Sequence, residues 1–202
     1  VLGIPLLFLF VPGEHREVHD KGKSHQIGIS QLQPVAEDQA QTAENLVDDG
    51  ALVGIVTDGD LRRLLERAAD VRNVHAAGGR LIISPHFDAE VVHEALRLGM
   101  ACMPGVATPS EAFAALKAGA HALKLFPAEM IGPAVVKALR AVLPASVPLL
   151  PVGGVSPDSM AAYRQAGATG FGIGSALYRP RQSAAQTAAI AAQFIECWKA
   201  LP

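Results

Sequence analysis

The amino-acid sequence predicts an α/β fold, a small (β/α)8 TIM barrel in which residues 1–202 form a single domain. Half of the residues are hydrophobic but only 5% are aromatic, a mixture that suits closely packed α/β layers better than an all-β sandwich. From about residue 71 onward, strand and helix signals alternate five times, which predicts a parallel sheet. In 202 residues, repeats at this spacing favour a barrel over an open doubly wound sheet.

The first two βα units carry clear helix signals. Residues 81–85 are predicted to form a strand, and Asp88 is predicted to cap a helix over residues 89–98. Residues 102–106 form the next predicted strand. Residues 108–111, Thr-Pro-Ser-Glu, then supply an N-cap, a proline at the first helical position and a capping-box glutamate for the following helix.

The other three units follow the same pattern, with glycines at several strand and helix ends. Each begins with an apolar run and continues into a segment with helical periodicity. They predict strands at residues 121–127, 147–152 and 170–174, and helices at residues 133–143, 157–166 and 184–200.

Residues 1–70 are atypical, and this part of the barrel is expected to be irregular. The three strands still needed have candidates at residues 4–11, 26–30 and 51–57, while helix signals between them are weak. The first candidate resembles the apolar core of a signal peptide but has no basic leader. It is far too short to span a bilayer as a helix, so a buried strand is the simpler interpretation.

Composition argues against several classes of function. The net charge is −2, with 17 basic and 19 acidic residues and no long block of like charge, so we expect no nucleic-acid footprint and no membrane-binding patch. Two cysteines, Cys102 and Cys197, are too few for a disulfide framework and favour a reducing cytoplasm. The seven histidines lack metal-ligand spacing, and we expect neither a metal nor a cofactor.

Lys124 is the residue on which the functional prediction depends. It lies in an apolar strand, where alternation puts Ala122, Lys124 and Phe126 on one face and the two flanking leucines on the other. Burial disfavours a charged ammonium, lowers its pKa and makes the neutral amine a nucleophile for a carbonyl carbon. The alternative is a lysine at a frayed strand end that reaches solvent.

Two glycine-containing turns give the second functional signal. Gly153-Gly154 and Gly174-Ser175 end consecutive predicted strands, so they would meet at the C-terminal mouth of a barrel. Backbone N–H groups without side-chain bulk can converge there on a phosphate, and a following helix N-terminus adds positive potential. Together with Lys124, these turns predict a phosphorylated substrate whose carbonyl carbon lies near the amine.

Four motifs resemble those of a known enzyme family. They are Pro-Gly-Val-Ala-Thr-Pro-Ser-Glu at 104–111, Leu-Lys-Leu-Phe-Pro-Ala at 123–128, Val-Gly-Gly-Val at 152–155 and Gly-Ile-Gly-Ser at 172–175. In this order and spacing they are similar to the class I 2-keto-3-deoxy-6-phosphogluconate/6-phosphogalactonate aldolases, over about residues 71–202. Residues 131–139 and 174–179 look like the 6-phosphogalactonate branch.

This resemblance implies reversible cleavage of a keto-deoxy sugar acid phosphate to pyruvate and glyceraldehyde 3-phosphate. It makes Lys124 the Schiff-base residue, puts Phe126 beside the imine as an aromatic wall, and gives Pro104 a role in shaping the pocket. The resemblance also implies a homotrimer. The positions that match the family's phosphate site are Gly153, Gly154, Gly174 and Ser175.

The N-terminal third departs from the family pattern. Thr57 falls where the family holds the pyruvate carboxylate, but the position of its proton-shuttling glutamate falls on Gly28, which cannot move a proton. A positioned general base typically supplies ~10²–10⁴-fold in rate, so slowed or absent carbon–carbon cleavage is an expectation. Residues 52–65 also resemble the end of a CBS module, as in arabinose-5-phosphate isomerases.

Two alternatives stay open at this point. Another phosphate-binding barrel, a lyase or an isomerase, would use Lys124 as an acid, a base or an electrostatic anchor. A non-catalytic protein would bind sugar phosphate in the barrel, or act as a CBS-like sensor through residues 57–60. A covalent adduct between pyruvate and Lys124 would separate the aldolase from both.

Overall fold

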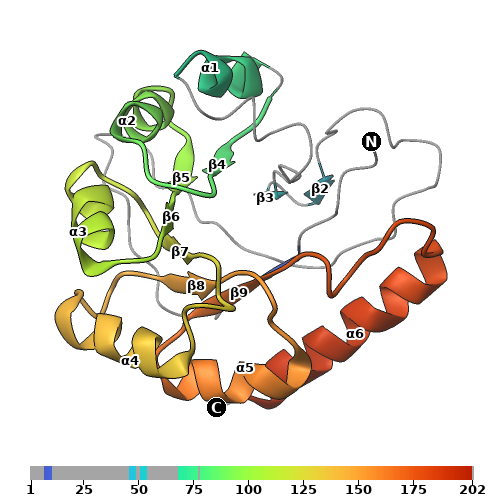
Figure 1. Cartoon of the computed structure of the whole chain (residues 1–202). Coiled ribbons are helices and arrows are strands. Elements are labelled where there is room, and N and C mark those ends of the chain that lie inside the picture. The colour runs from blue at the N-terminus through green and yellow to red at the C-terminus, as the bar shows by residue number, and fades with distance from the viewer. Residues whose placement is uncertain (1–6, 11–45, 49–50, 54–67, 77, 202) are drawn as a thin grey trace.

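The structure, a computed structural model, describes residues 7–10, 46–48, 51–53, 68–76 and 78–201 (Figure 1). Its strands are β1 (Leu7–Phe10), β2 (Leu46–Asp48), β3 (Ala51–Val53), β4 (Leu81–Ile83), β5 (Ala101–Met103), β6 (Gly105–Val106), β7 (Leu123–Leu125), β8 (Leu149–Pro151) and β9 (Gly170–Ile173). Its helices are α1 (Ala68–Ala76), α2 (Ala89–Arg97), α3 (Pro109–Lys117), α4 (Pro133–Val142), α5 (Pro157–Gln165) and α6 (Ala184–Ala200).

Strands β4 to β9 lie in chain order along an arc, inside a matching arc of helices (Figure 1). β4 pairs with β5, the strands β6, β7 and β8 form one three-stranded sheet, and a bridge from Val152 to Gly172 joins β8 to β9, all in parallel. β5 and β6 are the single strand predicted at residues 102–106, interrupted at Pro104, which has no N–H to donate. The five predicted βα units are therefore confirmed.

The helix ends follow their local sequence signals. The Asp88 carboxylate accepts the backbone N–H of Glu90 at 2.7 Å and that of Val91 at 3.2 Å, before α2. Thr108 and Glu111 form a reciprocal capping box before α3. Loss of such a cap typically costs ~1 kcal/mol, so local chemistry decides where these helices begin.

The strands separate two apolar regions. The helix-facing core lies between the sheet and the helices, and there Leu123 and Leu125 of β7 share a cluster with Val136 and Leu139 of α4. The opposite region, here called the inner cluster, has only strand-borne or strand-flanking residues as its buried members. These are Ile83, Met103, Ala122, Leu150 and Val152. Because side chains alternate along a strand, β7 and the residue before it contribute to both regions.

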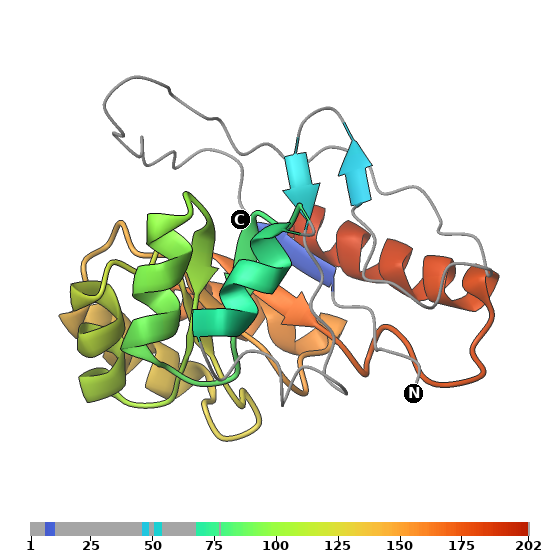
Figure 2. The ribbon, with the colours of Figure 1, turned by 90° about the horizontal axis from the view of Figure 1, so that it is seen from above.

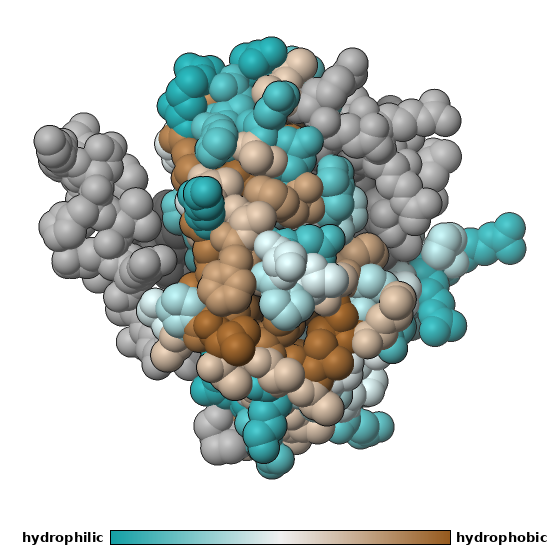
Figure 3. All heavy atoms as spheres, turned by 60° about the vertical axis from the view of Figure 1, so that its left-hand side comes forward, coloured by the Kyte–Doolittle hydropathy of each residue, from teal (hydrophilic) through white to brown (hydrophobic). Residues whose placement is uncertain are grey.

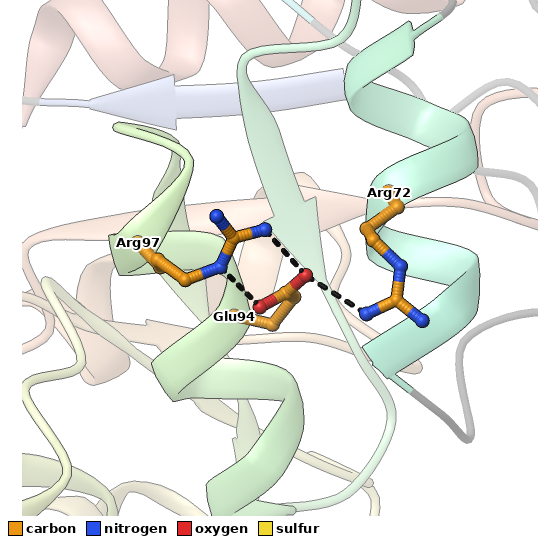
Figure 4. A network of polar contacts seen from close by, with 3 residues as sticks. All are labelled: Arg72, Glu94 and Arg97. Atoms are coloured by element: carbon orange, nitrogen blue, oxygen red, sulfur yellow. Dashed lines mark hydrogen bonds and ion pairs between the residues drawn. The ribbon is translucent and has the colours of Figure 1, made fainter.

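Helix α1 is joined to α2 through Glu94 (Figure 4). The Glu94 carboxylate accepts hydrogen bonds from Arg97 Nε at 2.7 Å and from Arg72 Nη1 at 2.9 Å. The hydrogen bonds from Arg97 and then Arg72 lower the pKa of Glu94 to about 2. Both arginines are exposed, so solvent weakens these ion pairs, and packing of Val71 into the apolar cluster under α2 is the main attachment of α1.

The described strands of the N-terminal third pair antiparallel. β1 runs antiparallel to β9, with Phe8 opposite Gly172, and lies beside α6 (Figure 2). β2 pairs antiparallel with β3, and the sequence between them, Asp49-Gly50, is a strong hairpin signal that the sequence analysis missed.

These pairings differ from the parallel strands that the sequence analysis expected. β1 and β3 coincide with strands predicted at residues 4–11 and 51–57, but neither continues the parallel arc. The candidate at residues 26–30 lies outside the described residues. Within the described ranges, the strands therefore do not close a barrel. For β2 and β3, an antiparallel pair needs only a short turn, whereas a parallel pair would need a crossover helix, and helix signals are weak in this part of the sequence.

Candidate functional site

Lys124 lies at the centre of β7, on the inner face of the sheet. Its neighbours Leu123 and Leu125 enter the helix-facing core, while Ala122 enters the inner cluster. In the ladder Lys124 pairs with Leu150 of β8, another residue of the inner cluster. The lysine is only 9% exposed. The predicted alternation along this strand and the burial of the lysine are both confirmed.

Phe126 and Pro104 both adjoin Lys124. The Lys124 Nζ lies 4.2 Å from the centre of the Phe126 ring, a distance at which the ring face attracts a cation. The backbone N–H of Lys124 donates to the Pro104 carbonyl at 3.0 Å. Pro104 is itself buried. These contacts put both predicted pocket residues beside the amine-bearing residue.

The C-terminal ends of β7, β8 and β9 lie side by side. The N–H of Val152 donates to the carbonyl of Leu125 at 3.0 Å, and Val152 also bridges Gly172. The pair Gly153-Gly154 follows directly, and the pair Gly174-Ser175 follows β9. The two predicted turns therefore end neighbouring strands at the edge of the sheet where β7 also ends.

Glycine is required at both positions of the first turn. Gly153 has φ +106° and Gly154 has φ +64°, a backbone conformation that residues with a Cβ rarely adopt. A Cβ at Gly153 would also lie 2.4 Å from Oε2 of Glu129, and a Cβ at Gly154 would lie 2.8 Å from Cγ of Glu129. The two glycines thus leave room for the Glu129 side chain to lie against the turn.

Glu129 is a site residue that the sequence analysis did not identify. Its segment is anchored because the Ala128 N–H donates to Val152 O at 2.8 Å and the Tyr163 hydroxyl donates to Ala128 O at 2.9 Å. Burial and, secondarily, the negative charge of Glu129 raise the pKa of Tyr163, which keeps this phenol protonated as a donor. The available signal was a carboxylate two residues after the proline that ends the lysine strand.

Cys102 and His121 serve the sheet rather than the chemistry. The Cys102 N–H donates to His121 Nδ1 at 3.1 Å, and the His121 N–H donates to Cys102 O at 3.0 Å, which joins β5 to the segment before β7. Burial raises the pKa of Cys102 to about 12, so its thiol does not supply a thiolate nucleophile at neutral pH.

The remaining predicted positions lie in the N-terminal third. Thr57 and Gly28 are outside the described residues. Within the part of the chain that the structure describes, no three His, Cys, Asp or Glu side chains gather as metal ligands would. The helices described there are all too short or too polar to cross a membrane.

Comparison with known proteins gives one family. The KDPG and KHG aldolase family matches residues 63–192. The chain is 47% identical to the 2-dehydro-3-deoxy-6-phosphogalactonate aldolase of Escherichia coli (strain K12) over 122 residues, which is 60% of each protein. It is 44% identical to the probable 2-dehydro-3-deoxy-6-phosphogalactonate aldolase of Rhizobium meliloti (strain 1021) over 144 residues, 71% of this chain and 65% of that protein.

Solved structures agree with the sequence comparison. The chain is similar to a native KDPGal structure, with a TM-score of 0.66 and 43% identity over 67% of this chain and 66% of the other. The chain spans less than two thirds of the length of these relatives. The likeness therefore covers part of this chain and part of each relative, and the family match at residues 63–192 ends within α6.

Proposed function

This chain belongs to the KDPG and KHG aldolase family, and from that premise we propose that it is a class I aldolase. The substrate is 2-dehydro-3-deoxy-6-phosphogalactonate, cleaved reversibly to pyruvate and glyceraldehyde 3-phosphate. Identities of 47% and 44% to relatives that carry the galactonate name support this choice over gluconate. The observation that carries the proposal is a buried lysine beside an aromatic ring on the inner face of β7.

In the proposed reaction, the neutral amine of Lys124 attacks the C2 ketone, and loss of water with uptake of one proton from solvent leaves a protonated imine. A base takes the proton of the C4 hydroxyl, the C3–C4 bond breaks, and its electron pair moves to the imine to give an enamine and the aldehyde. The enamine is then protonated at C3, and water hydrolyses the imine to pyruvate and free lysine. The Phe126 ring, 4.2 Å from Nζ, stabilises the positive imine by about 0.5–2 kcal/mol.

The phosphate end of the substrate binds at the two glycine turns in this proposal. Gly153, Gly154, Gly174 and Ser175 offer backbone N–H groups at the ends of adjacent strands. Helix α5 begins at Pro157, three residues beyond the first turn, and its N-terminus adds positive potential. Thr57 is proposed to hold the pyruvate carboxylate, and Pro104 to shape the wall beside the imine.

The direct test is trapping of the imine. The protein is incubated with pyruvate, reduced with borohydride and digested, and we expect a pyruvyl adduct on the peptide that carries Lys124. Lys124→Arg keeps a positive charge and removes the nucleophile, so its adduct should be absent while the fold is retained. Lys117→Arg, on the exposed face of α3, is the matched control and should label as the wild type does. Absence of any adduct on the wild type would favour a non-aldolase barrel enzyme or a binding protein.

The rate of cleavage tests the unusual N-terminal third. With Gly28 at the position of the proton-shuttling glutamate, we expect imine formation without fast carbon–carbon cleavage, about 10²–10⁴-fold slower than in an enzyme with a positioned base. Pyruvate trapping and aldehyde release, measured on the same sample, separate the two steps. Fast release would show that another group supplies the base.

The assembly is proposed to be a homotrimer that works in the cytoplasm, with the parallel arc as the TIM-barrel-like part of each chain. Support for an interface comes from exposed apolar side chains on neighbouring elements: Phe113 of α3, Met130 before α4 and Val135 on α4. Figure 3 shows hydrophobic atoms gathered on this side of the molecule. Light scattering would support the trimer if the wild type gives a single species with the mass of three chains. The Phe113→Glu variant should then give a smaller mass.

A further inference from the structure

The carboxylate of Glu129 occupies the space over the Gly153-Gly154 turn. A Cβ at Gly153 would lie 2.4 Å from Oε2 and 3.2 Å from Cδ of Glu129, so the carboxylate itself lies over this position. A Cβ at Gly154 would come within 3.1 Å of the same Cδ. Because the two consecutive glycines have no Cβ atoms, they leave a small hollow where those atoms would lie. The Glu129 side chain fills this hollow.

The charge of Glu129 is not neutralised by an ion pair with any lysine or arginine of the described ranges. The residue is exposed, so its side chain can turn away from the hollow into solvent. Its backbone cannot follow, because the Ala128 N–H and carbonyl are both held. Glu129 is therefore a tethered anion beside a turn whose N–H groups suit an anion.

We propose that Glu129 is a built-in competitor of the phosphate group, which lowers the affinity of the Gly153-Gly154 turn for free phosphate and so favours substrates held at both ends. This inference rests on the proposed phosphate site. A phosphate dianion and a carboxylate at such short range repel each other, so phosphate binds only once the side chain has moved. A substrate already linked to Lys124 displaces the carboxylate at high effective concentration, whereas inorganic phosphate competes only at its free concentration.

The test measures the dissociation constant of inorganic phosphate by calorimetry at low ionic strength. Glu129→Gln keeps the shape of the side chain and removes the charge, and we expect about 3–10-fold tighter phosphate binding, an advantage that shrinks as salt is added. Glu129→Ala should tighten binding to a similar degree, because the charge rather than the stem opposes phosphate. Glu90→Gln, an exposed position on α2, makes the same change in net charge and should bind phosphate as the wild type does.

Unchanged or weaker phosphate binding by Glu129→Gln would overturn the inference, and so would the absence of measurable phosphate binding in every variant. Pyruvate trapping on the same proteins keeps the proposed function separate, because pyruvate carries no phosphate. Labelled Lys124 together with unchanged phosphate affinity would reject only the role of Glu129. An unlabelled wild type would reject the aldolase, while the phosphate measurement would still decide whether Glu129 opposes anion binding.

Discussion

The two faces of β7 bury different kinds of side chain. On the helix-facing side, Leu123 and Leu125 are fully buried among apolar side chains of the sheet and helices. On the inner side, Lys124 is buried to nearly the same degree, between a small apolar cluster and the Phe126 ring. One three-residue strand therefore contributes to the helix-facing core on one face and holds the amine of the proposed reaction on the other. Substitutions on the two faces should separate stability from chemistry.

The largest expected effect is on the inner face. Lys124→Met removes the nucleophile and should abolish the pyruvate adduct, with cleavage reduced by about 10³-fold or more. The free energy of unfolding should change far less than this rate, because a flexible apolar side chain of similar length fills the same space beside the inner cluster. Adduct mass and urea denaturation on the same preparation check both halves. A large loss of stability would mean that the lysine supports the fold instead.

The helix-facing side should show the reverse. Leu123→Ala leaves a cavity in the helix-facing core and should lower the free energy of unfolding by about 2–5 kcal/mol. Under conditions where the variant is still folded, the pyruvate adduct on Lys124 should persist. Denaturation midpoints and trapping at low temperature give the two readouts. Loss of labelling by a fully folded Leu123→Ala would show that the two faces are not independent.

The glycine turn should give an intermediate effect. Gly153→Ala must hold φ near +106°, a backbone conformation that residues with a Cβ rarely adopt, so we expect a loss of about 1–3 kcal/mol and weaker phosphate binding. Gly99→Ala is the matched control, because Gly99 has φ +69° with no atom within 4 Å of an added Cβ, and should cost only about 1 kcal/mol. Thermal unfolding of both variants compares the cost of a Cβ in the two backbone conformations. Equal losses would show that φ near +106° is no more strained here than φ near +69°.

The smallest effect is expected at Glu94, away from both faces of β7. Its pKa is lowered to about 2 in the folded protein, from an ordinary value of 4.5. The stabilisation from Arg97 and Arg72 is therefore fully present above about pH 4.5 and is lost as the pH falls toward 2. Glu94→Gln should be slightly less stable at pH 7, and its difference from the wild type should vanish in acid and shrink in high salt. A difference that grows in acid would contradict this assignment.

Local chemistry explains why the parallel part of the fold could be predicted. Asp88 and the Thr108–Glu111 box begin their helices as expected, and α6 has the predicted bounds. Helix signals in the sequence of the N-terminal third are weak, and parallel strands were expected there only to complete a barrel. The Asp49-Gly50 pair between β2 and β3 was a local signal of an antiparallel hairpin, and it was missed.

The candidate site also contains residues that could be predicted from the sequence and one that could not. Alternation along β7 was enough to place Lys124 and Phe126 on one face, and the proximity of Pro104 follows from the parallel register. The contact between Glu129 and the glycine turn could not be predicted, because it joins segments more than 20 residues apart through the bend after Pro127. Local sequence patterns do not predict a contact between a side chain that follows one strand and the turn that follows the neighbouring strand.

The amino-acid sequence by itself determined the five βα units, their caps, and a lysine on the face of β7 opposite the leucines, since these depend on interactions between residues close in the chain. Only the tertiary structure decided that β1 lies antiparallel on β9 and that Glu129 fills the hollow over Gly153. Those outcomes depend on how distant segments pack, where shape and burial of the whole chain outweigh any local preference.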